Sequence, residues 1–118
     1  MPELIACLSV GKGTWGHVGR IVQESNWDKI FLITNDYGKE NFTKNDKTEF
    51  IVVNANQGLK ELREEIYTKL KEKITGTEVG VNFISGSGKE HMALMSAILK
   101  LGVGIRLVAL TKDGIEEI

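Results

Sequence analysis

Residues 9–16, Ser-Val-Gly-Lys-Gly-Thr-Trp-Gly, have the composition of a loop that binds phosphate. Gly11, Gly13 and Gly16 satisfy the spacing G-x-G-x-x-G, in which glycines let backbone N–H groups approach a pyrophosphate at the start of a helix. Asp36 follows about 20 residues later, where an acidic side chain binds the ribose hydroxyls in dinucleotide sites. The pattern predicts a small NAD(P)- or mononucleotide-binding domain, although this motif alone has low specificity.

A second glycine-containing segment, Ser-Gly-Ser-Gly-Lys, spans residues 85–89 and precedes an apolar, helix-like stretch. It is similar to a P-loop, but the Walker A motif G-x-x-x-x-G-K-[ST] requires Gly at position 83 and Ser or Thr at position 90. This chain has Phe83 and Glu90 there, so we reject a Walker A motif. The segment is a second candidate anion-binding loop.

Basic residues gather beside both loops, although the formal net charge of the chain is −1. Residues 11–20 contain no acid and three ionisable side chains, Lys12, His17 and Arg20. After the second loop, Lys89 and His91 flank a single acid. Cations beside exposed backbone donors suit a polyphosphate or an oligonucleotide backbone, whereas the alternative is that they are solvated residues at helix starts.

The pattern of apolar residues predicts the strands and helices that position these loops. Five runs are continuously apolar rather than alternating, which is typical of parallel strands covered on both faces; they are residues 4–10, 29–34, 49–54, 78–85 and 105–110. Helices are predicted over residues 16–25, 59–74 and 89–101. The last helix is apolar on most sides, so we expect it to be buried on two sides, inside the domain or at a dimer interface.

This alternation predicts a single α/β domain over residues 1–118, a Rossmann-like, doubly wound, mainly parallel five-stranded sheet with helices on both faces. A turn signal at Asp113 and Gly114 is compatible with a short antiparallel edge strand at the C-terminus. Residues 35–46 are polar, and we expect a surface loop with one helical turn. In such a sheet the first and fourth strands are neighbours at the topological switch point, so both glycine loops open onto one crevice.

Two further features concern the rim of this crevice. Lys12 and Trp15 stand at positions of the first loop where small residues are usual, which weakens the NAD(P) hypothesis. Trp15 either stacks on a base or folds back over the core, and the sequence leaves both open. Asn35 and Tyr37, after the second strand, are placed at the rim by topology.

Composition excludes several classes of function. The 118 residues leave no room for separate cofactor and substrate domains, and no apolar run approaches the about 20 residues of a membrane span. No signal-peptide pattern opens the chain, so we expect a cytoplasmic protein. The single cysteine, Cys7, excludes a disulfide framework within the chain and favours a buried, unreactive thiol. The near-neutral charge argues against a protein that coats long nucleic acids, and no metal or other cofactor is expected.

Residues 82–110 resemble the signature segment of CRISPR-associated Rossmann-fold (CARF) domains. The matching positions are Asn82, Ser85, Gly86, Ser87, Gly88, Lys89 and Met92. The resemblance implies a homodimer that binds cyclic oligoadenylate, a second messenger of CRISPR-linked antiviral defence made of four or six AMP units, across its two-fold axis. The sequence departs from the family pattern in its Gly-Ser-Gly order and in the absence of a following effector domain. Together with the first loop, the resemblance gives these predicted ligand-binding residues: Gly11, Lys12, Gly13, Thr14, Trp15, Asn35, Ser85, Gly86, Ser87, Gly88, Lys89 and Met92.

The resemblance also implies either a passive receptor or a ring nuclease. Ring opening needs no metal, because a ribose 2′-OH can attack the neighbouring phosphate in line if the protein holds that geometry. The candidate catalytic residues are Lys89 and Lys12 for charge stabilisation, with Ser9, Thr14, Ser85 and Ser87 orienting the hydroxyl or the phosphate oxygens. His17 or His91 could carry a proton, but isolated histidines are more often surface residues. A third hypothesis is an interaction module with the apolar last helix as its dimer face.

Overall fold

The computed structural model of the chain describes residues 2–9 and 11–118, and the side chain of Lys12 lies outside that description. Six strands form one sheet in the order β3-β2-β1-β4-β5-β6. Their bounds are β1 Glu3–Cys7, β2 Ile30–Thr34, β3 Thr48–Val52, β4 Glu78–Asn82, β5 Gly104–Thr111 and β6 Gly114–Glu117. β1 to β5 pair in parallel, and β6 pairs antiparallel with β5. The predicted Rossmann-like fold and its antiparallel C-terminal strand are therefore confirmed.

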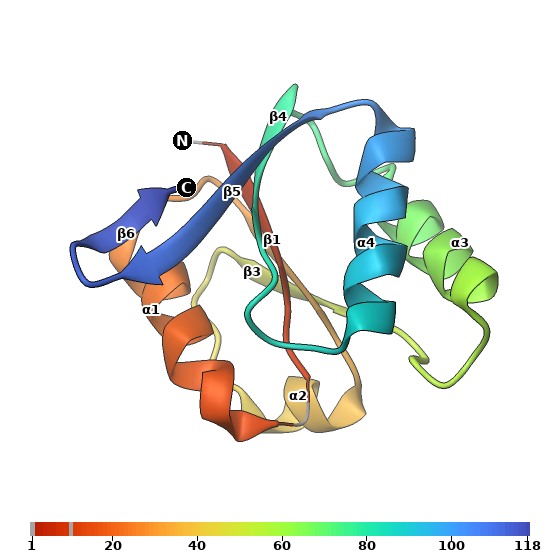
Figure 1. Cartoon of the computed structure of the whole chain (residues 1–118), viewed down its shortest axis with the longest axis horizontal. Coiled ribbons are helices and arrows are strands. Elements are labelled where there is room, and N and C mark those ends of the chain that lie inside the picture. Colours follow the sequence, from red (N-terminus) through yellow and green to blue (C-terminus); the bar gives the residue numbers. More distant parts are fainter. Residues whose placement is uncertain (1, 10) are drawn as a thin grey trace.

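The helices cover the two faces of the sheet (Figure 1). α1 Trp15–Glu24, preceded by the 3-10 turn η1 Lys12–Thr14, lies on one face, whereas α3 Leu59–Leu70 and α4 Gly88–Leu101 lie side by side on the other. The polar segment after β2 holds the short helix α2 Asp36–Asn41. Each helix presents an apolar stripe to the sheet, as the helical spacing predicts.

β1 is the central strand, and its side chains alternate between two cores. Leu4 and Ala6 pack with α1, while Ile5 and Cys7 pack with α3 and α4. Burial raises the pKa of the Cys7 thiol, and the Glu90 carboxylate raises it further. The thiol is therefore held in its neutral, unreactive form, as the sequence predicts.

β5 corrects one expectation. Its apolar run predicts a strand covered on both faces, yet none of its residues is fully buried. The helices cover β5 only in part: Val108 packs against the core under α1 and Ile105 against the core under α3 and α4, and only the short strand β6 continues the sheet beyond β5. Leu107 is left as an exposed apolar side chain as a result.

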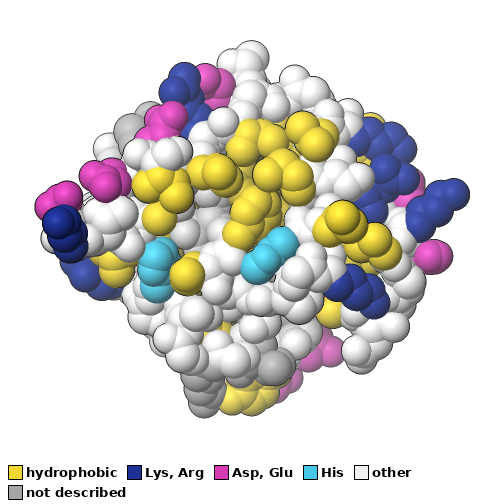
Figure 2. Space-filling model, in the orientation of Figure 1, with side chains coloured by type: hydrophobic (Ala, Val, Ile, Leu, Met, Phe, Trp, Pro, Cys, Tyr) yellow, Lys and Arg dark blue, Asp and Glu magenta, His cyan; other side chains and the backbone are white. Residues whose placement is uncertain are grey.

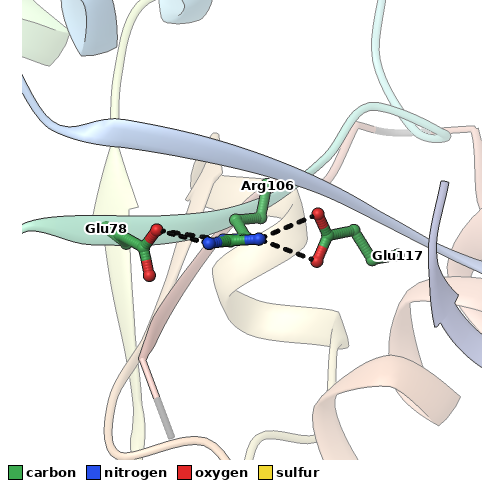
Figure 3. A network of polar contacts seen from close by, with 3 residues as sticks. All are labelled: Glu78, Arg106 and Glu117. Carbon is green, nitrogen blue, oxygen red and sulfur yellow. Dashed lines mark hydrogen bonds and ion pairs between the residues drawn. The ribbon is translucent and has the colours of Figure 1, made fainter.

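An ion-pair network fixes the β5–β6 hairpin to the sheet (Figure 3). The guanidinium of Arg106 on β5 donates to Glu78 on β4 at 2.7 Å and to Glu117 on β6 at 3.2 Å. All three side chains are about half exposed, so the network orients the hairpin more than it stabilises the fold. No helix among the described residues is long and apolar enough to cross a membrane.

Candidate functional site

The two glycine loops lie side by side at the carboxyl ends of β1 and β4. These strands pair in parallel, with Ala6 opposite Asn82, so the chain leaves the sheet at adjacent points. The backbone N–H of Ser9 donates to the hydroxyl oxygen of Ser85 at 2.9 Å, and Ser85 is only 1% exposed. This hydrogen bond joins the loops across 76 residues of sequence. The side-by-side position of the loops follows from the sheet order that the sequence predicts; a shared ligand site between them stays a prediction.

The first loop leads into a helix whose N-terminus has no cap. Thr14 occupies the N-cap position of α1, but its side chain makes no capping hydrogen bond, and the first turn holds no acidic residue. A Cβ added to Gly13 or Gly16 would meet no atom within 4 Å. Nothing within the described protein therefore requires glycine at these two positions, where the space that a side chain would occupy is open.

Trp15 folds back onto the domain. Its indole Nε1–H donates to the backbone oxygen of Ser9 at 2.6 Å, and its ring lies 5.7 Å from Phe42 and 6.0 Å from Tyr37 between centroids. The structure thus shows the second of the two arrangements that the sequence leaves open. Contact of Trp15 with a ligand stays a prediction.

The second loop is shaped by its own side chains. Gly86 has a φ of +106°, in the left-handed region that favours glycine. Ser87 caps α4 by accepting from Glu90 N at 3.2 Å, while the Glu90 carboxylate accepts from Ser87 N at 2.8 Å. Glu90 therefore already places an anion at the N-terminus of α4. We did not predict this role, although Ser-x-x-Glu before an apolar helix is the signature of a capping box.

The ammonium group of Lys89 is already hydrogen-bonded within the protein. Its Nζ donates to the backbone oxygen of Ala55 at 3.1 Å and to that of Gln57. Both acceptors belong to the segment between β3 and α3, so Lys89 links the first turn of α4 to that segment. Charge stabilisation by Lys89 would require these hydrogen bonds to open. Whether Lys12 can supply the charge lies outside the described residues.

A buried polar network stands behind the loops. Asn82, at the end of β4, donates from Nδ2 to the backbone oxygen of Val108 at 2.8 Å and accepts on Oδ1 from Ile84 N at 3.2 Å. His17 Nε2 lies 3.3 Å from Asn82 Nδ2 and accepts from Leu110 N at 3.2 Å. Burial lowers the pKa of His17. Sequence reasoning missed this network, because nothing in the motifs pairs His17 with β5.

The second histidine is also bonded to the protein. His91 Nε2 lies 2.8 Å from the backbone oxygen of Ser85, and its ring lies 5.1 Å from that of Phe83 between centroids. Both histidines are half-buried, so neither is the solvated surface residue that isolated histidines usually are.

A polar cavity lies at the ends of β2 and β3. It has a volume of about 380 Å³ and its lining includes Asn35, Asp36, Asn54 and Asn56. Asn35 Oδ1 accepts from Gly38 N at 2.9 Å and thereby caps α2. Asp36 lies in the first turn of that helix. The structure therefore places both residues at the same edge of the sheet as the glycine loops, as predicted.

Within the described part of the chain, no three His, Cys, Asp or Glu side chains cluster closely enough to hold a metal ion. No protein-family model matches the sequence, and no curated protein matches it significantly.

The hydrogen bond between the loops can be tested directly. Ser85→Ala leaves the N–H of Ser9 without its acceptor, and we expect a loss of about 1–3 kcal/mol in the free energy of unfolding. Urea titration measures this loss, and hydrogen exchange should be faster at the Ser9 amide. Ser96→Ala on α4, a hydroxyl with no hydrogen bond among the described residues, is the matched control. Equal stability of the two variants would contradict the assignment.

Proposed function

We propose that this chain is a CARF-type receptor that binds a cyclic oligoadenylate of four or six AMP units as a homodimer. The observation that carries the proposal is the joined pair of glycine loops at the switch point of the sheet, linked by the Ser9–Ser85 hydrogen bond. A doubly wound sheet binds its ligands at this point, outside the carboxyl ends of the strands.

The electrostatics of the first loop support an anionic ligand. The first N–H groups of α1 have no side-chain cap, and the helix dipole favours negative charge at that end. A phosphate seated there would meet the positive end of the helix dipole at a position that no side-chain cap occupies. Gly13 and Gly16 would let the phosphate approach the backbone closely.

An apolar face beside the second loop supports a dimer. Met92 and Leu99 on α4 are 62% and 65% exposed, and Ile84 in the loop is exposed as well. Phe83, Met92, Met95 and Leu99 help to line a groove of about 470 Å³. Figure 2 shows hydrophobic side chains gathered over α4 and β5 on this face. Exposed apolar patches of this kind often mark protein–protein contacts.

The position of this face suits a shared site. It starts at the second loop and continues along α4, so a two-fold axis roughly parallel to α4 would bring the loops of both copies to one end of the dimer. Each copy would then offer the same pair of loops to half of a ring. A ring of four or six identical nucleotides has the matching symmetry.

Ring opening is a further activity that this site could support. The Thr14 hydroxyl makes no capping hydrogen bond, so it could orient a 2′-OH or a phosphate oxygen. Ser9 lies in the same loop, where its Oγ accepts from Gly11 N at 3.4 Å. Lys89 would stabilise the developing charge only after leaving the Ala55 and Gln57 carbonyls. We therefore propose binding as the primary function and slow, metal-independent cleavage as an accompanying one.

One observation favours a second candidate, an NAD(P)- or mononucleotide-binding domain. The cavity at the ends of β2 and β3 contains Asp36, in the position from which an acid binds ribose hydroxyls. Its volume of about 380 Å³ falls within the usual range for small-ligand sites.

A ligand panel with two variants separates the candidates. We expect cyclic tetra- or hexa-adenylate, and not NAD or ATP, to raise the melting temperature, since a ligand at 100 times its Kd adds about 2.7 kcal/mol to the free energy of unfolding. Lys89→Ala should weaken cyclic oligoadenylate binding about 10- to 100-fold, as expected for a lost charged hydrogen bond, while Asp36→Ala changes little. Chromatography of the mixtures detects linear products.

The reverse pattern, a shift with NAD alone that is abolished by Asp36→Ala, would establish the second candidate. No shift with any of the nucleotides would contradict both and leave an interaction module.

The dimer face makes a separate prediction. Leu99→Glu places a charge in the proposed interface and should weaken self-association at least tenfold, because burying an unpaired carboxylate is costly. Sedimentation velocity measures the monomer–dimer equilibrium. Gln23→Glu adds the same charge on the exposed side of α1 and should leave it unchanged. A wild-type chain that stays monomeric with and without cyclic oligoadenylate would contradict the proposed dimer.

A further inference from the structure

We propose that His17 is a positioning residue that holds both glycine loops in place only while its imidazole is neutral, so that ligand binding at the loops is switched off by acid. This inference rests on the proposed function for its ligand, but the switch itself is a property of the free protein.

The geometry fixes the form of the ring. His17 Nε2 accepts from the backbone N–H of Leu110 at 3.2 Å and faces the Nδ2 of Asn82 at 3.3 Å. The side-chain amide nitrogen of asparagine can only donate, as can a backbone N–H. Nε2 must therefore carry a lone pair, and the neutral ring carries its proton on Nδ1.

Through its Nε2 atom, His17 links the elements that carry the two loops to β5. His17 directly follows Gly16 in the first turn of α1, whose uncapped N-terminus faces the first loop. Asn82 directly precedes the second loop and accepts from Ile84 N, and it also donates to Val108 on β5 at 2.8 Å. One imidazole nitrogen thus connects the elements on which both loops depend.

Protonation would remove this connection. An imidazolium carries N–H groups on both nitrogens, so Nε2–H would point at two donors and both hydrogen bonds would be lost. The start of α1 would separate from Leu110, and Asn82 would lose one of its partners. The backbone N–H groups of the first loop, which would bind phosphate, would then no longer be held in a fixed position relative to the backbone of the second loop.

The charged surroundings do not offset this change. On α1, Arg20 is paired with Glu24 at 2.6 Å. On the β5–β6 hairpin, Glu116 accepts from Thr111 at 3.0 Å, and Lys112 and Asp113 are exposed at the turn. β4 contributes only the uncharged Asn82 at this point. Burial alone accounts for the lowered pKa of His17, with no contribution from a neighbouring charge.

The sign of the pH dependence follows from linkage. The pKa of His17 is lower in the folded protein than the ordinary value of 6.5, so the unfolded chain takes up this proton first. The stabilising effect is complete above pH 6.5 and is lost as the pH falls from there towards the folded pKa. Ligand affinity then falls about tenfold for each further pH unit below the folded pKa, if only the neutral form binds.

The test compares wild type with His17→Gln and His91→Gln. Glutamine can place an acceptor oxygen near the position of Nε2 but does not titrate. His17→Gln should therefore bind cyclic tetra-adenylate with an affinity that stays flat from about pH 7.5 to about pH 5, the range in which histidines usually titrate. Wild type and His91→Gln should both lose affinity over this range. Equal pH dependence in wild type and His17→Gln would overturn the proposal.

Two measurements on the free wild-type protein keep the proposal testable if His17→Gln does not fold or no cyclic nucleotide binds. The nitrogen chemical shifts of His17 should report the Nδ1–H tautomer at neutral pH. Hydrogen exchange at the Leu110 amide should accelerate as the His17 ring becomes protonated. A ring protonated on Nε2 at neutral pH, or exchange at Leu110 that is independent of the ring's titration, would overturn the switch without bearing on the proposed function.

Discussion

The parallel pairing of β1 with β4 is the constraint on which the rest of the molecule depends. Because both strands are buried on both faces, their order and register are fixed by the two cores, and the loops that follow them must leave the sheet side by side. The hydrogen bond from Ser9 to the buried hydroxyl of Ser85 then fixes one loop against the other. The side-by-side position of the two loops is thus a consequence of core packing.

The N-termini of α1 and α4, which follow the two loops, are not equivalent. α4 is satisfied internally, since Ser87 and Glu90 form a capping box, whereas α1 lacks both a side-chain cap and an acid in its first turn. A phosphate at α1 therefore meets no capping side chain or carboxylate, but at α4 it must compete with the Glu90 carboxylate. This asymmetry supports a site in which the backbone of the first loop binds the anion. The second loop would provide shape, the contact with a second copy, and the charge of Lys89 once it leaves the Ala55 and Gln57 carbonyls.

The fold could be predicted because burial on both faces leaves a continuous apolar signal in the sequence. The partial exposure of β5 could not be predicted, because this strand near the edge of the sheet has the same apolar composition as a strand that is covered on both faces. At the site, the sequence was sufficient to predict that the two glycine loops follow neighbouring strands and lie close together. The direction of individual side chains was not: Lys89 bonds to a segment far away in sequence, and His17 bonds to the backbone of β5, contacts that only the tertiary structure creates.

Native mass spectrometry of the protein with cyclic tetra-adenylate and cyclic hexa-adenylate tests the central claim most directly, because the claim concerns stoichiometry as well as binding. If the loops of two copies share one ring, the dominant complex will contain two chains and one cyclic oligoadenylate, and the ring will promote the dimer. A complex of one chain with one nucleotide, or a dimer that carries no ring at any concentration, would contradict the account.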